Sequence, residues 1–131
     1  MKNDITNRDD ISTLVRTFYS KIRMDAELGP IFNAVITNWE QHLELLTKFW
    51  QMSLFGGREY KGDPFKAHQN VDNSTNNIIT ANHFGAWLNL WFATIDELFE
   101  GDNAKTLKRR ARKMQTPLMI AIFENREKIY K

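Results

Sequence analysis

The chain contains no cysteine. Disulfide bonds, thiolate zinc sites, cysteine-ligated iron–sulfur clusters and cysteine nucleophiles are therefore excluded together. The sequence also lacks a glycine-rich phosphate loop, an H-E-x-x-H helix, a G-x-S-x-G turn and an EF-hand loop, which mark many nucleotide, zinc, hydrolase and calcium sites. Any function must depend on residues outside these familiar signatures.

Long apolar runs are missing too. No stretch approaches the roughly 20 apolar residues that a membrane-spanning helix needs. The first ten residues are polar and of mixed charge, unlike the apolar stretch of a secretory signal. We therefore expect a cytoplasmic protein with no membrane partner.

The chain has 131 residues, of which 42% are hydrophobic and 26% charged. This length suits one hydrophobic core and is too short for two, so we expect a single domain over residues 1–131. The composition falls in the ordinary globular range.

The formal net charge is only +2, which by itself does not indicate a nucleic-acid partner. Basic residues do gather between Lys105 and Lys113. We interpret this stretch as a solvated helix face, because no aromatic platform accompanies it. A helical interaction or regulatory domain that uses the stretch is the alternative.

Apolar residues recur at helical spacing along most of the chain, which predicts an all-α fold. We expect a first helix around Ile11 to Ile22, ending before Gly29-Pro30. A second helix should open with a capping box from Thr37 to Glu40 and end at Gly56-Gly57.

The second half should hold one short helix and two long ones. Asp63 and Pro64 predict the start of the short helix, which should reach about Gln69 and be followed by a loop over residues 70–82. A long helix should begin near Phe84 and end at Gly101. The last helix should cover residues 103–131, with a bend at Pro117.

Four polar groups fall on or beside apolar helix faces: Tyr19, His42, His68 and the indole N–H of Trp87. Burying such groups is costly unless each finds a partner. A neutral histidine can ligate iron. The pattern alone nevertheless favours a structural histidine over a ligand at position 68, and the same holds for His42.

Taken in order, several segments together resemble a group III truncated haemoglobin over nearly the whole chain. They are Phe18-Tyr19, Leu28-Gly29-Pro30-Ile31-Phe32, Trp39-Glu40-Gln41-His42-Leu43, Phe49-Trp50, Tyr60-Lys61-Gly62, Pro64 with His68, and His83-Phe84-Gly85-Ala86-Trp87-Leu88. The resemblance implies a two-over-two helical sandwich around haem b, with the helix that carries the iron ligand reduced to a turn or so.

The same resemblance implies roles for single residues. His68 is similar to the proximal iron ligand. Residues that resemble the distal side, where a diatomic ligand binds, are Tyr19, His42, Leu46 and Trp87. Residues that resemble pocket walls or partners of the haem propionates are Phe32, Phe49, Trp50, Arg58, Tyr60, Lys61 and Lys66.

The resemblance implies a protein that binds oxygen, carbon monoxide, nitric oxide or a similar small ligand, as in oxygen transport. The alternative is a redox enzyme that acts on nitric oxide or peroxide. It would need a separate reductase, because the sequence has no flavin or nicotinamide fingerprint. One departure stands out: between His68 and Trp87 the chain is longer and richer in asparagine than is usual in the family.

Overall fold

The computed structural model describes residues 2–75 and 77–130, with side chains up to residue 126. Its helices are α1 (Arg8–Met24), α2 (Leu28–Val35), α3 (Trp39–Phe55), α4 (Pro64–Ser74), α5 (Ala81–Leu98) and α6 (Asp102–Tyr130). No strand occurs among the described residues. The predicted all-α class is confirmed.

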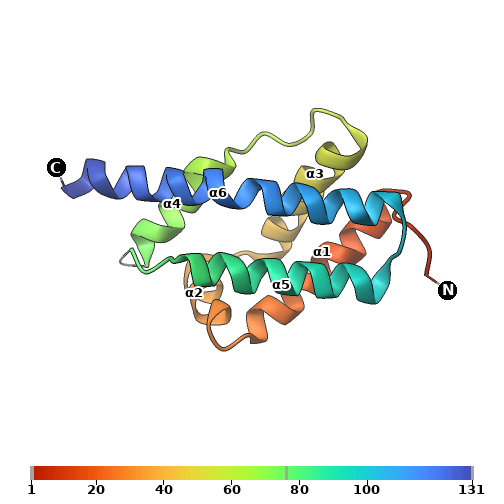
Figure 1. Ribbon diagram of the computed structural model, residues 1–131, viewed down its shortest axis with the longest axis horizontal. Coiled ribbons are helices and arrows are strands. Elements are labelled where there is room, and N and C mark those ends of the chain that lie inside the picture. The colour runs from red at the N-terminus through yellow and green to blue at the C-terminus, as the bar shows by residue number, and fades with distance from the viewer. Residues whose placement is uncertain (1, 76, 131) are drawn as a thin grey trace.

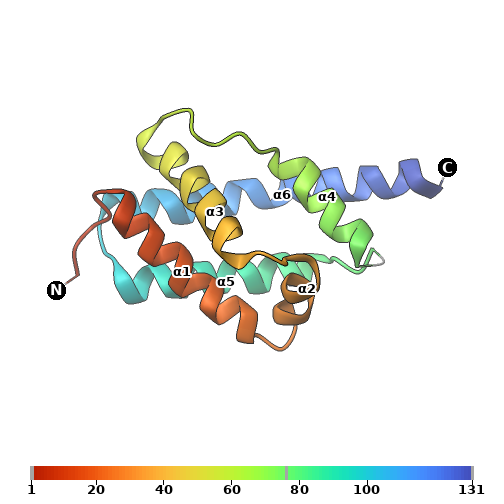
Figure 2. The same ribbon diagram turned by 180° about the vertical axis from the view of Figure 1, so that it is seen from behind.

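Two layers of helices cross each other. Helices α5 and α6 run side by side on the face nearest the viewer in Figure 1, and α1 and α3 lie on the opposite face, shown in Figure 2. Helix α1 packs against α2, α3 and α5, while α5 also packs against α6. This arrangement is the two-over-two sandwich that the resemblance implied.

The core lies where the two layers meet. Helix α1 contributes the predicted stripe of Ile11, Leu14, Val15, Phe18, Tyr19 and Ile22, all buried. Phe18 makes edge-to-face contacts with Tyr19, Trp87 and Trp91, and Trp50 stacks on Trp91 at 4.8 Å between ring centroids. This aromatic cluster connects α1, α3 and α5, and it supports the neighbouring polar groups from beneath.

Helix α2 was not predicted. Pro30 lies in its first turn, where a backbone N–H has no partner within the helix and proline is tolerated. Gly29 allows α2 to approach α1 closely, because a Cβ there would lie 2.7 Å from the Arg23 carbonyl oxygen. The Gly29-Pro30 pair, which predicts the end of one helix, thus also serves the beginning of the next.

The ends of α3 are close to prediction, with one correction. Asn38, and not Thr37, caps the helix, since its side chain accepts a hydrogen bond from the Gln41 N–H. The helix ends at Gly56 as predicted, where φ is 84° and glycine carries no steric penalty.

Helix α4 is longer than predicted. Asp63 caps it and Pro64 opens it, as expected. It reaches Ser74, however, so it has 11 residues, about three turns, and is not reduced to a turn or so. The predicted loop over 70–82 shrinks accordingly, because α5 begins at Ala81. Contacts with α6, described below, hold the asparagine-rich segment in a helix.

The start of α5 is held by a capping box between Thr80 and His83, in which the Thr80 N–H donates to His83 Nδ1 at 2.9 Å. The helix ends at Leu98, three residues before the predicted stop. Helix α6 runs unbroken past Pro117, so proline does not end it. None of the helices in the described part of the chain is both long and apolar enough to cross a membrane.

Candidate functional site

The two histidines with a possible role as ligands lie on helices that do not touch each other. His42 is on α3 and His68 is on α4, and no described residues of these helices come within 8 Å of one another between Cα atoms. A linker over residues 56–63 joins them across one face of the molecule (Figures 1 and 2). Space between α3 and α4 is therefore not closed by helix packing.

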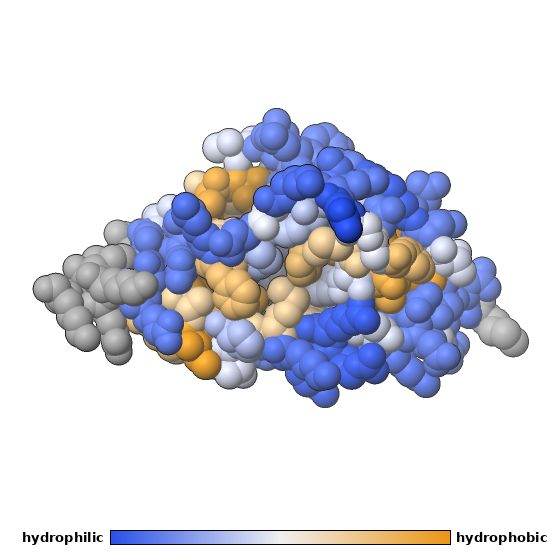
Figure 3. Space-filling view, turned by 90° about the horizontal axis from the view of Figure 1, so that it is seen from above, coloured by the Kyte–Doolittle hydropathy of each residue, from blue (hydrophilic) through white to orange (hydrophobic). Residues whose placement is uncertain are grey.

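Large apolar side chains are left half-exposed around this part of the fold, although each packs against the core. We call them the apolar wall; its members are Phe32, Leu46, Phe49, Phe84 and Trp87. In the view from above, apolar side chains gather in the middle of the face between hydrophilic margins (Figure 3). A flat apolar ligand would remove this surface from water, which is energetically favourable.

His68 has the geometry of a ligand through one defined nitrogen. Its Nδ1–H donates to the Pro64 carbonyl oxygen at 2.6 Å, because a carbonyl can only accept. This bond leaves Nε2 as the nitrogen with a free lone pair. Burial lowers the pKa of His68, and the bond to Pro64 only partly offsets this, so the neutral form that binds metals is favoured.

The ring of Phe84 stacks on the ring of His68, with 6.1 Å between centroids and 20° between planes. The imidazole is thus held from two sides, by a hydrogen bond on α4 and by an aromatic ring on α5. Sequence reasoning quoted Phe84 as part of a motif but gave it no role. The signal that could have found it is its position one turn before Trp87 on the same helix.

His42 presents the opposite situation, because its Nε2 is buried and has no hydrogen-bond partner in the described part of the chain. Burial lowers the pKa of this histidine. Its ring stands edge-on to both Tyr19 and Trp39, at 5.8 Å between centroids in each case. A buried nitrogen without a partner is costly and is most readily explained by a ligand that the site receives.

Tyr19 lies at the centre of this group and is 5% exposed. Burial raises the pKa of its hydroxyl above the ordinary value, against the opposing effect of a hydrogen bond from Trp87. Tyr19 therefore keeps its proton at neutral pH. Since its oxygen accepts from the indole N–H, its own O–H remains as a donor to a third group.

The structure brings the remaining wall candidates together only in part. Phe32 contacts Tyr19 at 5.8 Å, and Phe49 contacts Tyr60 at 5.1 Å. Trp50, by contrast, is 3% exposed and lies in the core against Trp91. Trp50 thus lies deeper than the apolar wall.

The candidates for binding acidic groups lie at the solvent edge. Arg58 and Lys61 are exposed in the linker between α3 and α4, and Lys66 is exposed in the first turn of α4. Tyr60 is half-buried, and burial followed by the charge of Asp63 raises its pKa. Three cations thus flank the entrance from the linker side, where the carboxylates of an amphipathic ligand would meet water.

A second feature was not foreseen from the sequence. A surface cavity of about 470 Å³ lies between α1, α2 and α3, and its lining includes Arg23, Trp39 and Tyr19. The guanidinium of Arg23 covers the Trp39 ring at 4.5 Å from its centroid. The cavity reaches the distal group from the side away from α4.

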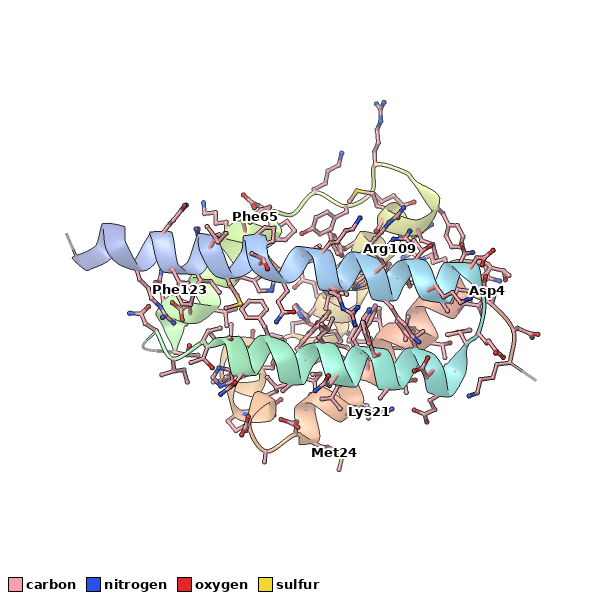
Figure 4. All side chains as sticks on the ribbon, viewed as in Figure 1. Asp4, Lys21, Met24, Phe65, Arg109 and Phe123 are labelled. Carbon is pink, nitrogen blue, oxygen red and sulfur yellow. The ribbon has the colours of Figure 1, made fainter. Side chains whose placement is uncertain are left out.

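The basic stretch between Lys105 and Lys113 is partly engaged within the protein. Lys108 pairs with Asp96, and Arg112 lies over the Phe92 ring at 4.9 Å. Arg110 donates to Ser53 Oγ at 3.3 Å, while Arg109 is exposed on α6 (Figure 4). These contacts direct the charges in several directions along α6.

Comparison with known proteins supports the same architecture. No protein-family model matches the chain. A curated group 3 truncated haemoglobin of Campylobacter jejuni is 29% identical over 128 residues, which cover 95% of this chain and 97% of that protein. The crystal structure of the group III truncated haemoglobin from Campylobacter jejuni superposes with a TM-score of 0.82 at 28% identity, covering 93% of this chain and 95% of that one.

The chain has the group III truncated haemoglobin fold. The resemblance seen in the sequence is thereby confirmed at the level of the fold. In this truncated haemoglobin fold the match extends over both helical layers and through α4, because it covers nearly the whole of each chain.

Proposed function

We propose that this chain binds haem b and uses it to hold oxygen or a related diatomic ligand. The observation that carries the proposal is the state of His68, whose Nδ1 is engaged with Pro64 and whose Nε2 is left as a lone-pair donor. Haem, when bound, supplies an iron with one coordination position for a protein ligand and an opposite one for a small molecule. The similarity to truncated haemoglobins supports this choice of cofactor.

The residues present fit such a group. An apolar wall that is half-exposed without a ligand suits the flat faces of a macrocycle, and exposed cations at positions 58, 61 and 66 suit its propionates. His68 approaches from α4, whereas Tyr19, His42 and Leu46 lie on the layer formed by α1 and α3. The proximal and distal roles are assigned on this basis.

Tyr19 is the donor that would stabilise a ligand bearing partial negative charge. Its O–H is protonated and its orientation is fixed by Trp87, which donates to the same oxygen. Hydrogen bonds of this kind are stronger in a site from which water is excluded. Trp87 thus acts through Tyr19 in the present arrangement, and His42 supplies a second polar atom nearby.

Reversible ligand binding is tested on purified protein loaded with haem and reduced under argon. Oxygen is then admitted and removed again while the absorption spectrum is recorded. We expect the spectrum to change and to return over repeated cycles. Oxidation of the sample in a single cycle would contradict reversible binding, and rapid consumption of added nitric oxide with a cellular reductant would favour the redox alternative.

A further inference from the structure

Helix α4 is held in place by a buried ion pair. Asp72 is fully buried, and its carboxylate accepts two hydrogen bonds from Arg126 on α6, from Nη2 to Oδ1 at 2.6 Å and from Nε to Oδ2 at 2.8 Å. The Ile79 N–H donates to Asp72 Oδ1 at 3.2 Å, and Arg126 Nη2 donates to the Ile79 carbonyl at 2.7 Å. The pair therefore connects α4, the loop before α5, and α6.

What makes this connection unusual is that α4 has little else to hold it. Asp72 is the only buried residue of this helix among those described. A helix in a globular protein is normally fixed by a buried apolar stripe, but here a carboxylate takes that place. Helix α4 packs mainly against α6, touches α2, and does not contact α3.

A small apolar cluster lies beside the ion pair. Ile31, Ile79 and Ile122 form its buried part, and Val71 and Phe84 pack against it. Phe84 is also the residue that stacks on His68. The ion pair, the loop and the proximal imidazole are thus connected through direct contacts within two turns of α4.

We propose that Asp72 and Arg126 are positioning residues for His68, which rests on the proposed function. His68 precedes Asp72 by four residues and lies one turn away on the same helix. The bond to Pro64 fixes the imidazole relative to α4, so the placement of α4 determines where Nε2 points. The ion pair determines that placement, because a bidentate Arg–carboxylate pair restricts both distance and angle.

The inference predicts a change in the iron–histidine bond. Asp72→Asn and Arg126→Gln each remove one charge and leave the other buried. In ferrous protein loaded with haem, we expect both variants to lower or broaden the iron–histidine stretching band in the resonance Raman spectrum. We also expect haem transfer to a scavenger apoprotein to accelerate about tenfold, as is typical when a residue that orients a metal ligand is lost.

The chain offers a matched control on the same two helices. Asn125 Nδ2 donates to Asn73 Oδ1 at 3.2 Å, at positions adjacent to the ion pair but more exposed. We expect Asn73→Ala to leave both the band and the transfer rate unchanged. An equal effect of Asn73→Ala would show that any loosening of α4 suffices and would overturn the specific role of the ion pair.

Two measurements separate the possible failures. If wild-type protein takes up no haem, the proposed function itself falls. If wild-type protein takes up haem and the Asp72 and Arg126 variants show its band and its transfer rate, only the positioning role falls. Should both variants fail to fold by circular dichroism, Arg126→Lys keeps the charge and removes the planar fork; we expect a smaller shift of the band in the same direction, and an unshifted band overturns the inference.

Discussion

The ring of His42 stands perpendicular to the ring of Tyr19, with 5.8 Å between centroids and 88° between planes. The two residues come from different helices of one layer, α3 and α1. One presents a buried nitrogen without a partner, and the other presents a hydroxyl that keeps its proton. They form a polar pair within an otherwise apolar region.

Replacing Tyr19 by Phe should weaken the binding of a polar ligand. In haem-loaded protein we expect oxygen dissociation to accelerate about tenfold, since a hydrogen bond to a partly charged acceptor is worth about 1.5 kcal/mol. Stopped-flow displacement of oxygen measures the rate. Carbon monoxide, a less polar ligand, is the internal control, and a larger effect on its dissociation than on that of oxygen would contradict the donor role.

Replacing His42 by Ala should leave haem in place and change the kinetics of ligand binding. The imidazole is removed from the distal side, while His68 and its bond to Pro64 are untouched. Flash photolysis of the carbon monoxide complex gives the association rate. His83→Ala is the control, because His83 acts in the capping box of α5; a loss of haem from His42→Ala alone would reverse the proximal and distal assignments.

Acid should destabilise the haem-free chain through its two buried histidines. Burial lowers the pKa of both His42 and His68 below the ordinary 6.5. The unfolded chain therefore binds protons that the folded chain does not, and the free energy of unfolding falls as the pH drops below 6.5. Urea titrations above and below this pH measure the change, and we expect a smaller one in His42→Leu. A pH dependence identical to that of wild type would contradict the assignment.

Asp4 caps a helix that begins almost a hundred residues later in the chain. Its carboxylate accepts from the N–H groups of Asn103 and Ala104 at 2.9 and 3.0 Å, beside the start of α6 (Figure 4). Burial would raise the pKa of Asp4, but these backbone bonds outweigh it and lower the pKa. We expect Asp4→Ala to reduce the free energy of unfolding by about 1 kcal/mol, measured by urea titration.

The contribution of Asp4 should disappear in acid, because its pKa is lowered and the capping carboxylate is lost as the pH falls below 3.8. Glu124→Ala, an exposed acidic position on the same helix, is the control of equal charge. Equal destabilisation by the two substitutions at neutral pH would show that net charge, and not capping, is responsible.

The sequence predicted those parts of the fold that depend on local patterns. The stripe of α1, the glycine end of α3 and the Asp63-Pro64 start of α4 all follow from spacing or from the chemistry of one or two residues. Sequence reasoning missed what depends on distant partners. Helix α4 extends past Gln69 because Asp72 meets Arg126 from α6, and no local pattern reveals that contact.

The candidate site shows the same division. The periodic pattern correctly placed Tyr19 on a buried face, but burial alone did not show that Trp87 bonds to its hydroxyl. Trp50 and Phe49 are neighbours in sequence and were expected to share one wall. Adjacent helical residues point about 100° apart, and the structure turns Trp50 into the core and leaves Phe49 half-exposed.

The central claim is that His68 binds haem iron, and a haem titration of wild-type protein against His68→Gly tests it most directly. We expect the wild-type Soret band to saturate at one haem per chain and to shift on reduction and addition of carbon monoxide. His68→Gly should lose this spectrum and recover it with added imidazole, which can occupy the space left by the side chain. A wild-type protein that stays colourless, or a His68→Gly protein with an unchanged titration and spectrum, would contradict the claim.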